Sequence, residues 1–179
     1  IHSKEINHPK GSRLNKKVLG VLNHVDHVVA NSNFTKNLAL KLGVEEKRLI
    51  VINPGVDPVE EIPKDDLKQA EEMLKGKKQR LITVSRFDKR KNHEKVIMAI
   101  RNLKEKYPDI TYTCIGYGDE EENLKKLVIE LKLDKYVVFL SDISNELKNA
   151  LIAKSNIFIM PSIIHKTSVE GFGISFIEA

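Results

Sequence analysis

The feature that most constrains the fold of this chain is a regular alternation of short apolar runs with amphipathic helical patterns. The apolar runs are typical of buried β-strands and lie at residues 80–85, 110–115, 136–140 and 156–160. Residues at helical spacing precede the first run and separate the others: Leu67, Ala70 and Leu74; Val96, Ile97, Ile100 and Leu103; Leu124, Leu127, Val128 and Leu131; Leu147, Ala150 and Leu151. Because right-handed crossovers place helices on both sides of a parallel sheet, the pattern predicts an α/β fold with a parallel sheet covered on both faces.

A shorter alternation of strand and helix patterns lies in the first 53 residues. The pattern predicts a helix from Ser12, a strand at 26–31, a helix that ends at Gly43 and a strand at 49–53. Residues 1–11 are polar, and we predict that they are irregular. These elements are too few to close a core of their own.

The clearest linker pattern lies at residues 53–63, where three prolines and a glycine fall within eleven residues. We therefore predict three parts: the end of an N-terminal domain at 1–56, a linker at 57–66 and a larger α/β domain at 67–179.

Composition narrows the class of protein. The 179 residues are 41% hydrophobic, which is enough for one globular domain and part of a second. No apolar run is long enough for a transmembrane helix or a signal peptide. The single cysteine, Cys114, cannot form an internal disulfide, which favours a cytoplasmic protein. The net charge of +5 favours anionic substrates or an acidic membrane surface.

A basic loop follows the first strand of the larger domain. Four cations fall within the six positions from Arg86 to Lys91. Ligands of open parallel sheets bind beyond the carboxyl ends of the strands, and a rigid Arg fork together with a compact Lys charge suits a diphosphate. The alternative is a solvated surface loop, but its place at a strand end favours the anion site.

The last stretch of the chain carries a second candidate site. A proline stop at Pro161 leads through a polar loop to Gly171 and Gly173 and then to a helical pattern. The glycines and the helix start favour a phosphate, whereas Glu170 and Glu178, eight positions apart, suit sugar hydroxyls. The alternative is that the glycines only shape a turn and that Glu178 is solvated.

The run Gly116-Tyr117-Gly118 matches only the first three positions of a dinucleotide fingerprint. Acidic residues follow it and would repel a phosphate. We therefore predict a tight turn from strand to helix that at most touches a base or a ribose, with Asp119 as the cap of the helix and Glu122 three residues on.

Taken in order, these motifs resemble those of the retaining glycosyltransferases of the GT-B fold, in particular family 4. Residues 84–92 are similar to the family's strand, its Arg, and its Lys five residues later. Residues 158–162 and 170–179 are similar to its proline-serine turn and its paired-glutamate motif. Residues 26–32 and 51–57 match the run from the first domain into the second, so the resemblance covers most of the chain.

The resemblance implies a Rossmann-like half of a GT-B fold, incomplete at both ends, in which 1–56 closes the acceptor-side domain and 67–179 binds the nucleotide-sugar. It implies that Glu170 is catalytic and contacts the transferred sugar. The remaining implied donor-binding residues are Arg86 and Lys91 at the diphosphate, Glu178 at the ribose, and Gly171, Phe172 and Gly173 in the glycine-containing motif.

The implied reaction moves a sugar from a nucleotide-sugar to a hydroxyl acceptor, a glycan or a lipid-linked glycan, with retention. It belongs to polysaccharide, lipopolysaccharide or glycolipid synthesis and needs no metal or other cofactor. Two fixed cations can stabilise a leaving diphosphate in place of a divalent ion. We expect the protein in the cytoplasm, in contact with the inner face of the membrane.

The sequence departs from the family in three places. An acceptor-side domain is present only in part, so we expect these 179 residues alone to be inactive. The sequence stops at Ala179, where the family continues with further strands and helices, so we expect self-association through exposed apolar surface. The loop 163–169 is longer than usual, and Ser141 stands where a glycine is common. His2 corresponds to a family histidine near the sugar or belongs to a frayed end.

Two other classes of function are alternatives to a transferase. A non-catalytic module of the same fold would bind a nucleotide or an anion without transferring a sugar. Nucleic-acid binding is disfavoured, because aromatic residues make up 6% of the chain and tryptophan is absent, which leaves few stacking platforms.

Overall fold

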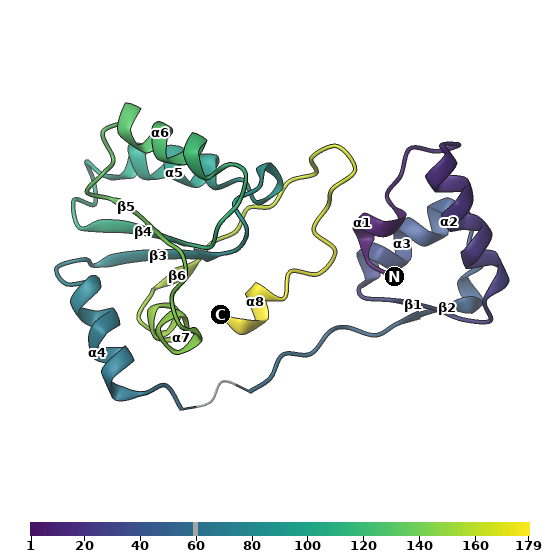
Figure 1. Ribbon diagram of the computed structural model, residues 1–179, viewed down its shortest axis with the longest axis horizontal. Helices are drawn as coiled ribbons and strands as arrows, with labels where there is room; N and C mark the ends of the chain where they lie inside the picture. The colour runs from purple at the N-terminus through teal and green to yellow at the C-terminus, as the bar shows by residue number, and fades with distance from the viewer. Residues whose placement is uncertain (59–60) are drawn as a thin grey trace. The chain divides into compact units, whose positions relative to one another are not determined.

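The computed structural model describes residues 1–58 and 61–179 (Figure 1). The chain divides into two compact units, the first made of residues 1–56 and 162–174 and the second of residues 57–161 and 175–179. Residues 162–174 thus group with the first unit, whereas they were predicted to belong to the larger domain. The predicted linker at 57–66 contains residues 59–60, which lie outside the described residues.

A parallel sheet forms the centre of the second unit. Its described strands are β3 (Gln79–Val84), β4 (Ile110–Ile115), β5 (Val137–Leu140) and β6 (Ile157–Phe158), in the spatial order β5-β4-β3-β6. The central strand β4 is buried along its whole length, as expected for a strand covered on both sides. This arrangement confirms the predicted α/β fold.

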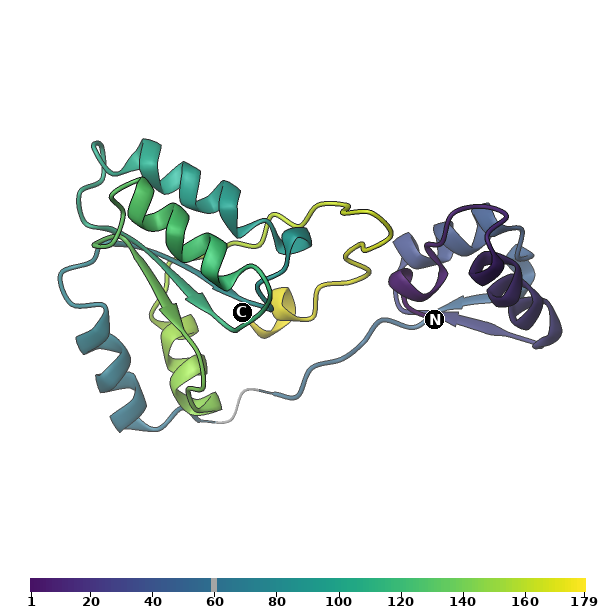
Figure 2. The same ribbon diagram turned by 45° about the horizontal axis from the view of Figure 1, so that its top comes forward.

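Two pairs of helices cover the sheet, one pair on each face (Figures 1 and 2). Helices α5 (His93–Leu103) and α6 (Glu121–Glu130) pack on one face through a core that includes Ile97, Ile100 and Leu133. Helices α4 (Lys64–Met73) and α7 (Asn145–Ala153) pack on the other face through a core around Ile82. Each helix buries the apolar stripe that the sequence predicted.

The start of α6 differs from the prediction. The helix begins at Glu121 after Glu120, and no side chain caps it, so the expected cap by Asp119 is wrong. The reason lies in the turn before the helix, where the Glu120 N–H donates to the Phe87 carbonyl at 3.0 Å. This long-range bond holds the chain in a turn for two residues beyond Gly118, and the helix therefore starts later.

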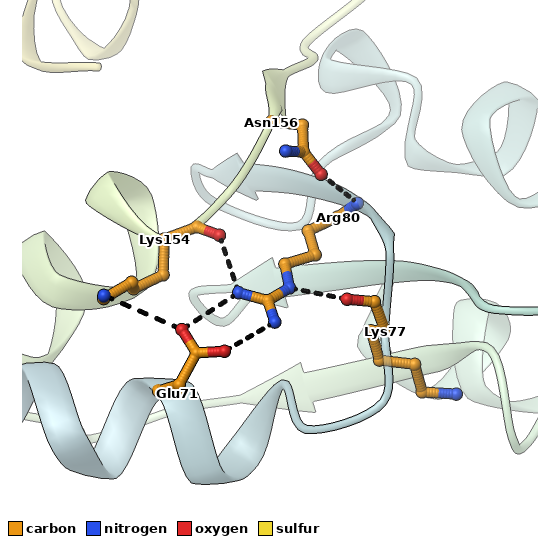
Figure 3. Close-up of polar contacts among 5 residues, drawn as sticks. All are labelled: Glu71, Lys77, Arg80, Lys154 and Asn156. Atoms are coloured by element: carbon orange, nitrogen blue, oxygen red, sulfur yellow. Dashed lines mark hydrogen bonds and ion pairs between the residues drawn. The ribbon is translucent and has the colours of Figure 1, made fainter.

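A polar cluster secures the amino end of β3 (Figure 3). The Arg80 guanidinium donates to both carboxylate oxygens of Glu71, at 2.7 and 3.2 Å, and to the Lys77 carbonyl at 2.8 Å. The Arg80 N–H donates to the side-chain oxygen of Asn156 at 2.8 Å, and the Lys154 ammonium lies 3.7 Å from Glu71. Because these residues come from α4, from the turn after it, from β3 and from the segment between α7 and β6, the cluster ties four parts of the unit together.

The first unit contains the described elements α1 (Ser3–Ile6), α2 (Arg13–His24), β1 (Val28–Ala30), α3 (Asn33–Leu42), the 3₁₀ helix η1 (Glu46–Arg48) and β2 (Leu49–Val51). Strands β1 and β2 pair in parallel. Gly43 ends α3 in the left-handed conformation, as predicted, with φ of 96°.

The prediction that residues 1–11 are irregular is wrong for one turn. Helix α1 forms there, and the Glu5 carboxylate accepts a hydrogen bond from the His2 N–H at 2.9 Å. Ile6, the last residue of this turn, packs in a hydrophobic core of the first unit and is 2% exposed. A single turn is too short to show a helical period in the sequence.

The described residues contain neither a helix that could span a membrane nor a cluster that could hold a metal ion. Across residues 1–58 and 61–179, no helix combines the length and the apolar character needed to cross a membrane. In the same residues, no group of three or more His, Cys, Asp or Glu side chains is placed to hold a metal ion.

Candidate functional site

The strand order of the second unit fixes where a ligand would bind. The chain builds β3, β4 and β5 outward in one direction and then places β6 on the other side of β3. In open α/β sheets, the crevice at such a reversal lies between the carboxyl ends of the two strands and receives the ligand. Here the reversal lies between β3 and β6, so the segments that follow these strands form the candidate site.

The basic loop follows β3 and is joined to the end of β6. Asp88 caps the 3₁₀ helix η2 (Lys89–Lys91), its carboxylate accepting from the Lys91 N–H at 3.1 Å. The Lys91 ammonium lies 3.2 Å from the Met160 sulfur, and the Asn92 amide donates to the Pro161 carbonyl at 3.1 Å. These two contacts hold the loop after β3 against the segment after β6, and so join the two segments that flank the reversal.

Arg86 and Lys91 differ in their surroundings. Arg86 is exposed, whereas Lys91 is 9% exposed and lies against Met160. Phe87, between them in sequence, is fully buried and packs edge-on against His93 with 5.0 Å between ring centres. The buried ring anchors the loop, which leaves the Arg86 guanidinium open to a ligand.

The Gly116-Tyr117-Gly118 turn lies against this loop. The Phe87 N–H donates to the Tyr117 carbonyl at 2.8 Å. Gly118 has φ of 155°, and a Cβ atom there would lie 2.5 Å from the Phe87 carbonyl oxygen. The two glycines therefore permit a close approach of two backbones, as the sequence predicted for a tight turn, and Tyr117 between them is 66% exposed.

A chain of buried polar side chains, which the sequence did not predict, lies beneath the loop. Thr83 pairs with the Tyr112 hydroxyl at 2.7 Å, Tyr112 with His93 Nδ1 at 2.9 Å, and His93 Nε2 with the Ser85 hydroxyl at 3.1 Å. Burial lowers the pKa of His93 to about 4, so its imidazole is neutral at pH 7. The sequence does show polar residues, Thr83 and Tyr112, within apolar strands. Which side chains pair with one another, however, depends on the order of the strands in the sheet.

Glu178, the predicted ribose ligand, also lies in the second unit. It ends the short helix α8 (Ser175–Glu178) and is exposed. Phe176 in the same helix packs edge-on against Phe158 of β6 with 5.3 Å between ring centres. Arg86, Lys91 and Glu178 are thus the predicted site residues that belong to this unit.

The remaining predicted site residues, Glu170, Gly171, Phe172 and Gly173, belong to the first unit. The Ser162 hydroxyl lies 3.4 Å from a Glu170 carboxylate oxygen. A Cβ atom at Gly171 would lie 2.5 Å from the Ser3 hydroxyl oxygen, and the Ser32 hydroxyl donates to the Gly171 carbonyl. This position therefore admits only glycine without a shift of its neighbours.

The loop that leads to Glu170 packs on the start of the chain. The Asn7 amide donates to the Thr167 carbonyl at 2.9 Å, and His165 and Ser168 form a tight bridged turn. His2 is ordered as the residue before α1, and its Nδ1 lies 3.1 Å from the Asn31 amide nitrogen. The alternative of a frayed end for His2 is therefore wrong.

Family models match both parts of the chain. The model described as glycosyl transferases group 1 matches residues 64–179, and the model described as glycosyltransferase family 4 matches residues 1–60. The first of these covers more than half of the chain.

Individual relatives agree. The GDP-mannose-dependent alpha-(1-6)-phosphatidylinositol monomannoside mannosyltransferase of Mycolicibacterium smegmatis is 28% identical over 161 residues, which cover 88% of this chain and 42% of the relative. The alpha-1,3/1,6-mannosyltransferase ALG2 of Candida glabrata is 30% identical, over 86% of this chain and 40% of the relative. The chain thus spans about two fifths of the length of these relatives.

A solved structure shows the same fold. The crystal structure of HepE from Anabaena in complex with UDP superposes with a TM-score of 0.77 at 21% identity, over 99% of this chain and 49% of that protein. Together with the strand order and the family models, this likeness identifies the class of protein. The chain belongs to the glycosyl transferases group 1 family and has the fold of the GT-B, family 4 type.

Proposed function

We propose that the chain is the donor-binding part of a glycosyltransferase that moves a sugar from a nucleotide-sugar to a hydroxyl acceptor with retention of configuration. The observation that carries the proposal is the basic loop at the reversal of strand order, held there by the Asn92 and Lys91 contacts to the end of β6. A diphosphate needs fixed cations, and this loop supplies them where the fold receives a ligand.

Each predicted residue has a role in the proposal. The exposed Arg86 and the largely buried Lys91 bind the donor diphosphate and stabilise it as it leaves. Glu178 accepts hydrogen bonds from the ribose hydroxyls, and Glu170 contacts the transferred sugar as the catalytic residue. Gly171, Phe172 and Gly173 bring backbone close to the donor, because a glycine-containing turn has few side-chain atoms to keep a phosphate away.

The named relatives support a sugar donor of this kind. One of them is a GDP-mannose-dependent mannosyltransferase, and the HepE structure contains UDP. Another relative is named as an amylovoran biosynthesis glycosyltransferase. We therefore propose a role in the synthesis of a polysaccharide, a lipopolysaccharide or a glycolipid, with a glycan or a lipid-linked glycan as the acceptor.

We propose that side chains of the protein, and not a metal ion, neutralise the charge of the leaving diphosphate. Arg86 and Lys91 take the place that a divalent ion has in other glycosyltransferases, so the reaction needs no metal. Chelation with EDTA is accordingly expected to leave nucleotide affinity unchanged.

Calorimetric titration of the 179-residue chain with UDP, GDP and ADP tests the donor site. We expect saturable binding of one nucleotide, weakened by Arg86→Ala and by Lys91→Ala by about 1.5–3 kcal/mol each, the range for a hydrogen bond to a charged group. Arg101→Ala is the matched control, because Arg101 is an exposed cation near the far end of α5. Equal affinities in the wild type and in both site variants would contradict the proposal, and equal losses in all three variants would show that net charge alone drives binding.

A further inference from the structure

The buried polar chain beneath the basic loop crosses the sheet at the reversal of strand order. It runs from the Ile159 carbonyl, just after β6, through Thr83 of β3 and Tyr112 of β4 to His93, the first residue of α5, and ends at Ser85. Thr83 and His93 are each 1% exposed, and Tyr112 is fully buried. Buried polar groups of this kind are costly unless every one is paired.

The carbonyl at one end fixes the direction of the first hydrogen bonds. A carbonyl only accepts, so the Thr83 hydroxyl donates its one hydrogen to Ile159. Thr83 then accepts from the Tyr112 hydroxyl at 2.7 Å. The hydrogen of Tyr112 is used in that bond, so the contact of 2.9 Å between Tyr112 and His93 requires a hydrogen on Nδ1 of His93.

The charge state of His93 fixes the last bond. Burial is the main cause that lowers the pKa of this imidazole to about 4, and Lys91 lowers it further, although the Arg86 carbonyl and the Asp88 carboxylate oppose the shift. A neutral imidazole with its hydrogen on Nδ1 has a bare Nε2, which accepts from the Ser85 hydroxyl at 3.1 Å. The opposite tautomer would leave one of these contacts without a hydrogen.

The Arg86 carbonyl is a second acceptor for that hydrogen. The Ser85 hydroxyl lies 3.3 Å from this carbonyl and 3.1 Å from Nε2 of His93, and the carbonyl also accepts from the Asp88 N–H at 3.0 Å. The remaining neighbour of the imidazole, the Phe87 ring, packs edge-on and offers no hydrogen-bonding group. We assign the Ser85 hydrogen to the shorter contact, the one to the bare Nε2 of His93, and this bond completes the chain.

We propose that Thr83, Tyr112 and His93 form a one-way hydrogen-bond relay that turns the Ser85 hydroxyl inward and positions the carboxyl ends of β3 and β6 for nucleotide binding. The proposal rests on the proposed function, because it gives these residues a role only through the donor site. They are positioning residues that do not touch the ligand.

The relay has a consequence for the diphosphate. With its hydrogen committed to His93, the Ser85 hydroxyl has only lone pairs to offer and cannot donate to a phosphate oxygen. The phosphate contacts after β3 therefore fall to Arg86 and Lys91. Loss of the relay frees Ser85 to turn and loosens the link between β3 and β6.

The tautomer of His93 tests the direction of the relay. Long-range proton–nitrogen spectra of the ¹⁵N-histidine-labelled 179-residue chain report which ring nitrogen carries the hydrogen, and the signal that vanishes in His93→Gln assigns the residue. We expect the Nδ1–H form at pH 7. In Thr83→Val, Tyr112 has lost Thr83 as its acceptor and turns its hydrogen toward Nδ1, a stronger acceptor than the neighbouring Cys114 sulfur. His93 therefore changes to the Nε2–H form although Thr83 does not touch it.

Titration with UDP, GDP and ADP tests the positioning role in the same variants. We expect Thr83→Val to lower the affinity for the bound nucleotide about three- to tenfold, the range for loss of one buried hydrogen bond. Thr111→Val is the matched control, because it removes a buried threonine hydroxyl of β4 that donates to the Tyr136 carbonyl and not to a relay residue, and it should change neither the tautomer nor the affinity.

The outcomes separate the two proposals. An Nε2–H form in the wild type, or an unchanged tautomer in Thr83→Val, overturns the relay. A changed tautomer with an unchanged affinity overturns the positioning role and leaves the proposed function standing. Absence of binding by all three nucleotides in the wild type overturns the proposed function, and the positioning role with it.

Discussion

The side-chain amide of Asn92 donates a hydrogen bond to the carbonyl of Pro161 at 3.1 Å, across the reversal of strand order. Asn92 also holds a left-handed backbone conformation, with φ of 61°, between η2 and α5. One residue thus sets both the path of the basic loop and its attachment to the segment after β6.

Substitutions at Asn92 separate these two contributions. Asn92→Gly keeps the left-handed conformation but loses the bond to Pro161, so nucleotide affinity should fall about two- to fivefold in calorimetry. Asn92→Ala should show the same loss and in addition lower the free energy of unfolding by about 1 kcal/mol, because alanine is strained at this φ. Asn102→Ala is the control, because Asn102 lies on the exposed side of α5. If both Asn92 variants bind the nucleotide with wild-type affinity, the basic loop does not need its bond to Pro161.

The close approach at Gly118 predicts a large loss of stability. In Gly118→Ala the new Cβ atom would lie 2.5 Å from the Phe87 carbonyl oxygen and 2.8 Å from its nitrogen, so backbone must move. We expect the free energy of unfolding to fall by about 2–4 kcal/mol in urea denaturation. Gly76 has φ of 75° but no neighbour within 4 Å, so Gly76→Ala should cost only the strain, about 1 kcal/mol. Similar losses in the two variants would mean that the turn can relax away from Phe87.

The pKa of His93, lowered by burial to about 4 from an ordinary value near 6.5, predicts a dependence of stability on pH. Above pH 6.5 the imidazole is neutral in both the folded and the unfolded chain and contributes no pH dependence. Between pH 6.5 and 4 the unfolded chain binds a proton that the folded chain excludes, so stability falls by about 3 kcal/mol as the pH is lowered through this window. Urea denaturation at several pH values should show this fall in the free energy of unfolding in the wild type but not in His93→Gln. The same pH dependence in both proteins would show that a group other than His93 takes up the proton.

The Arg80 cluster predicts a stabilising role away from the nucleotide (Figure 3). Arg80→Lys cannot reproduce the paired bonds to Glu71, and the free energy of unfolding should fall by about 1–2 kcal/mol with nucleotide affinity unchanged. The hydrogen bond from Arg80 holds the pKa of Glu71 below its usual range, so this contribution is present at neutral pH and is lost as the pH falls through the lowered pKa. Lys75→Ala removes the exposed ion pair with Glu72 and should have little effect. A drop in nucleotide affinity in Arg80→Lys would show that the cluster also supports the donor site.

Glu178 can be tested with two ligands. If its carboxylate binds the ribose, Glu178→Gln should weaken the nucleoside diphosphate about tenfold or more and leave the affinity for inorganic pyrophosphate unchanged. Arg86→Ala should weaken both ligands, because it removes a phosphate contact. Equal weakening of pyrophosphate in Glu178→Gln would assign that carboxylate a structural role.

The sequence predicted best those features that depend on neighbours along the chain. The strand at 110–115 was located to the residue, because an apolar run buried on both sides shows directly in the sequence. The cap at Asp119 was wrong, because a bond from Glu120 to Phe87, distant in sequence, delays the helix. The basic loop could be placed at a strand end, but only the strand order shows that this end lies at the reversal.

The hydrogen-bond relay shows most clearly what could not be predicted from the sequence. Thr83, Tyr112 and His93 each look ordinary in the sequence, two as residues of apolar strands and one at the start of a helix. Their pairing depends on the register between β3 and β4 and on the position of α5 over them. The grouping of Glu170 with the start of the chain was equally hidden, since it depends on contacts over more than 130 residues, such as that between Ser32 and Gly171.

The assignment of residues 162–174 to the first unit means that neither unit corresponds to one continuous stretch of the gene. The chain passes from one unit to the other three times, at 56–57, at 161–162 and at 174–175. A protease that cuts only between residues 57 and 63 would therefore leave the two products held together by the segment that carries Glu170. Expression of residues 57–179 alone would deprive that segment of Ser3, Asn7 and Ser32, the residues on which it folds.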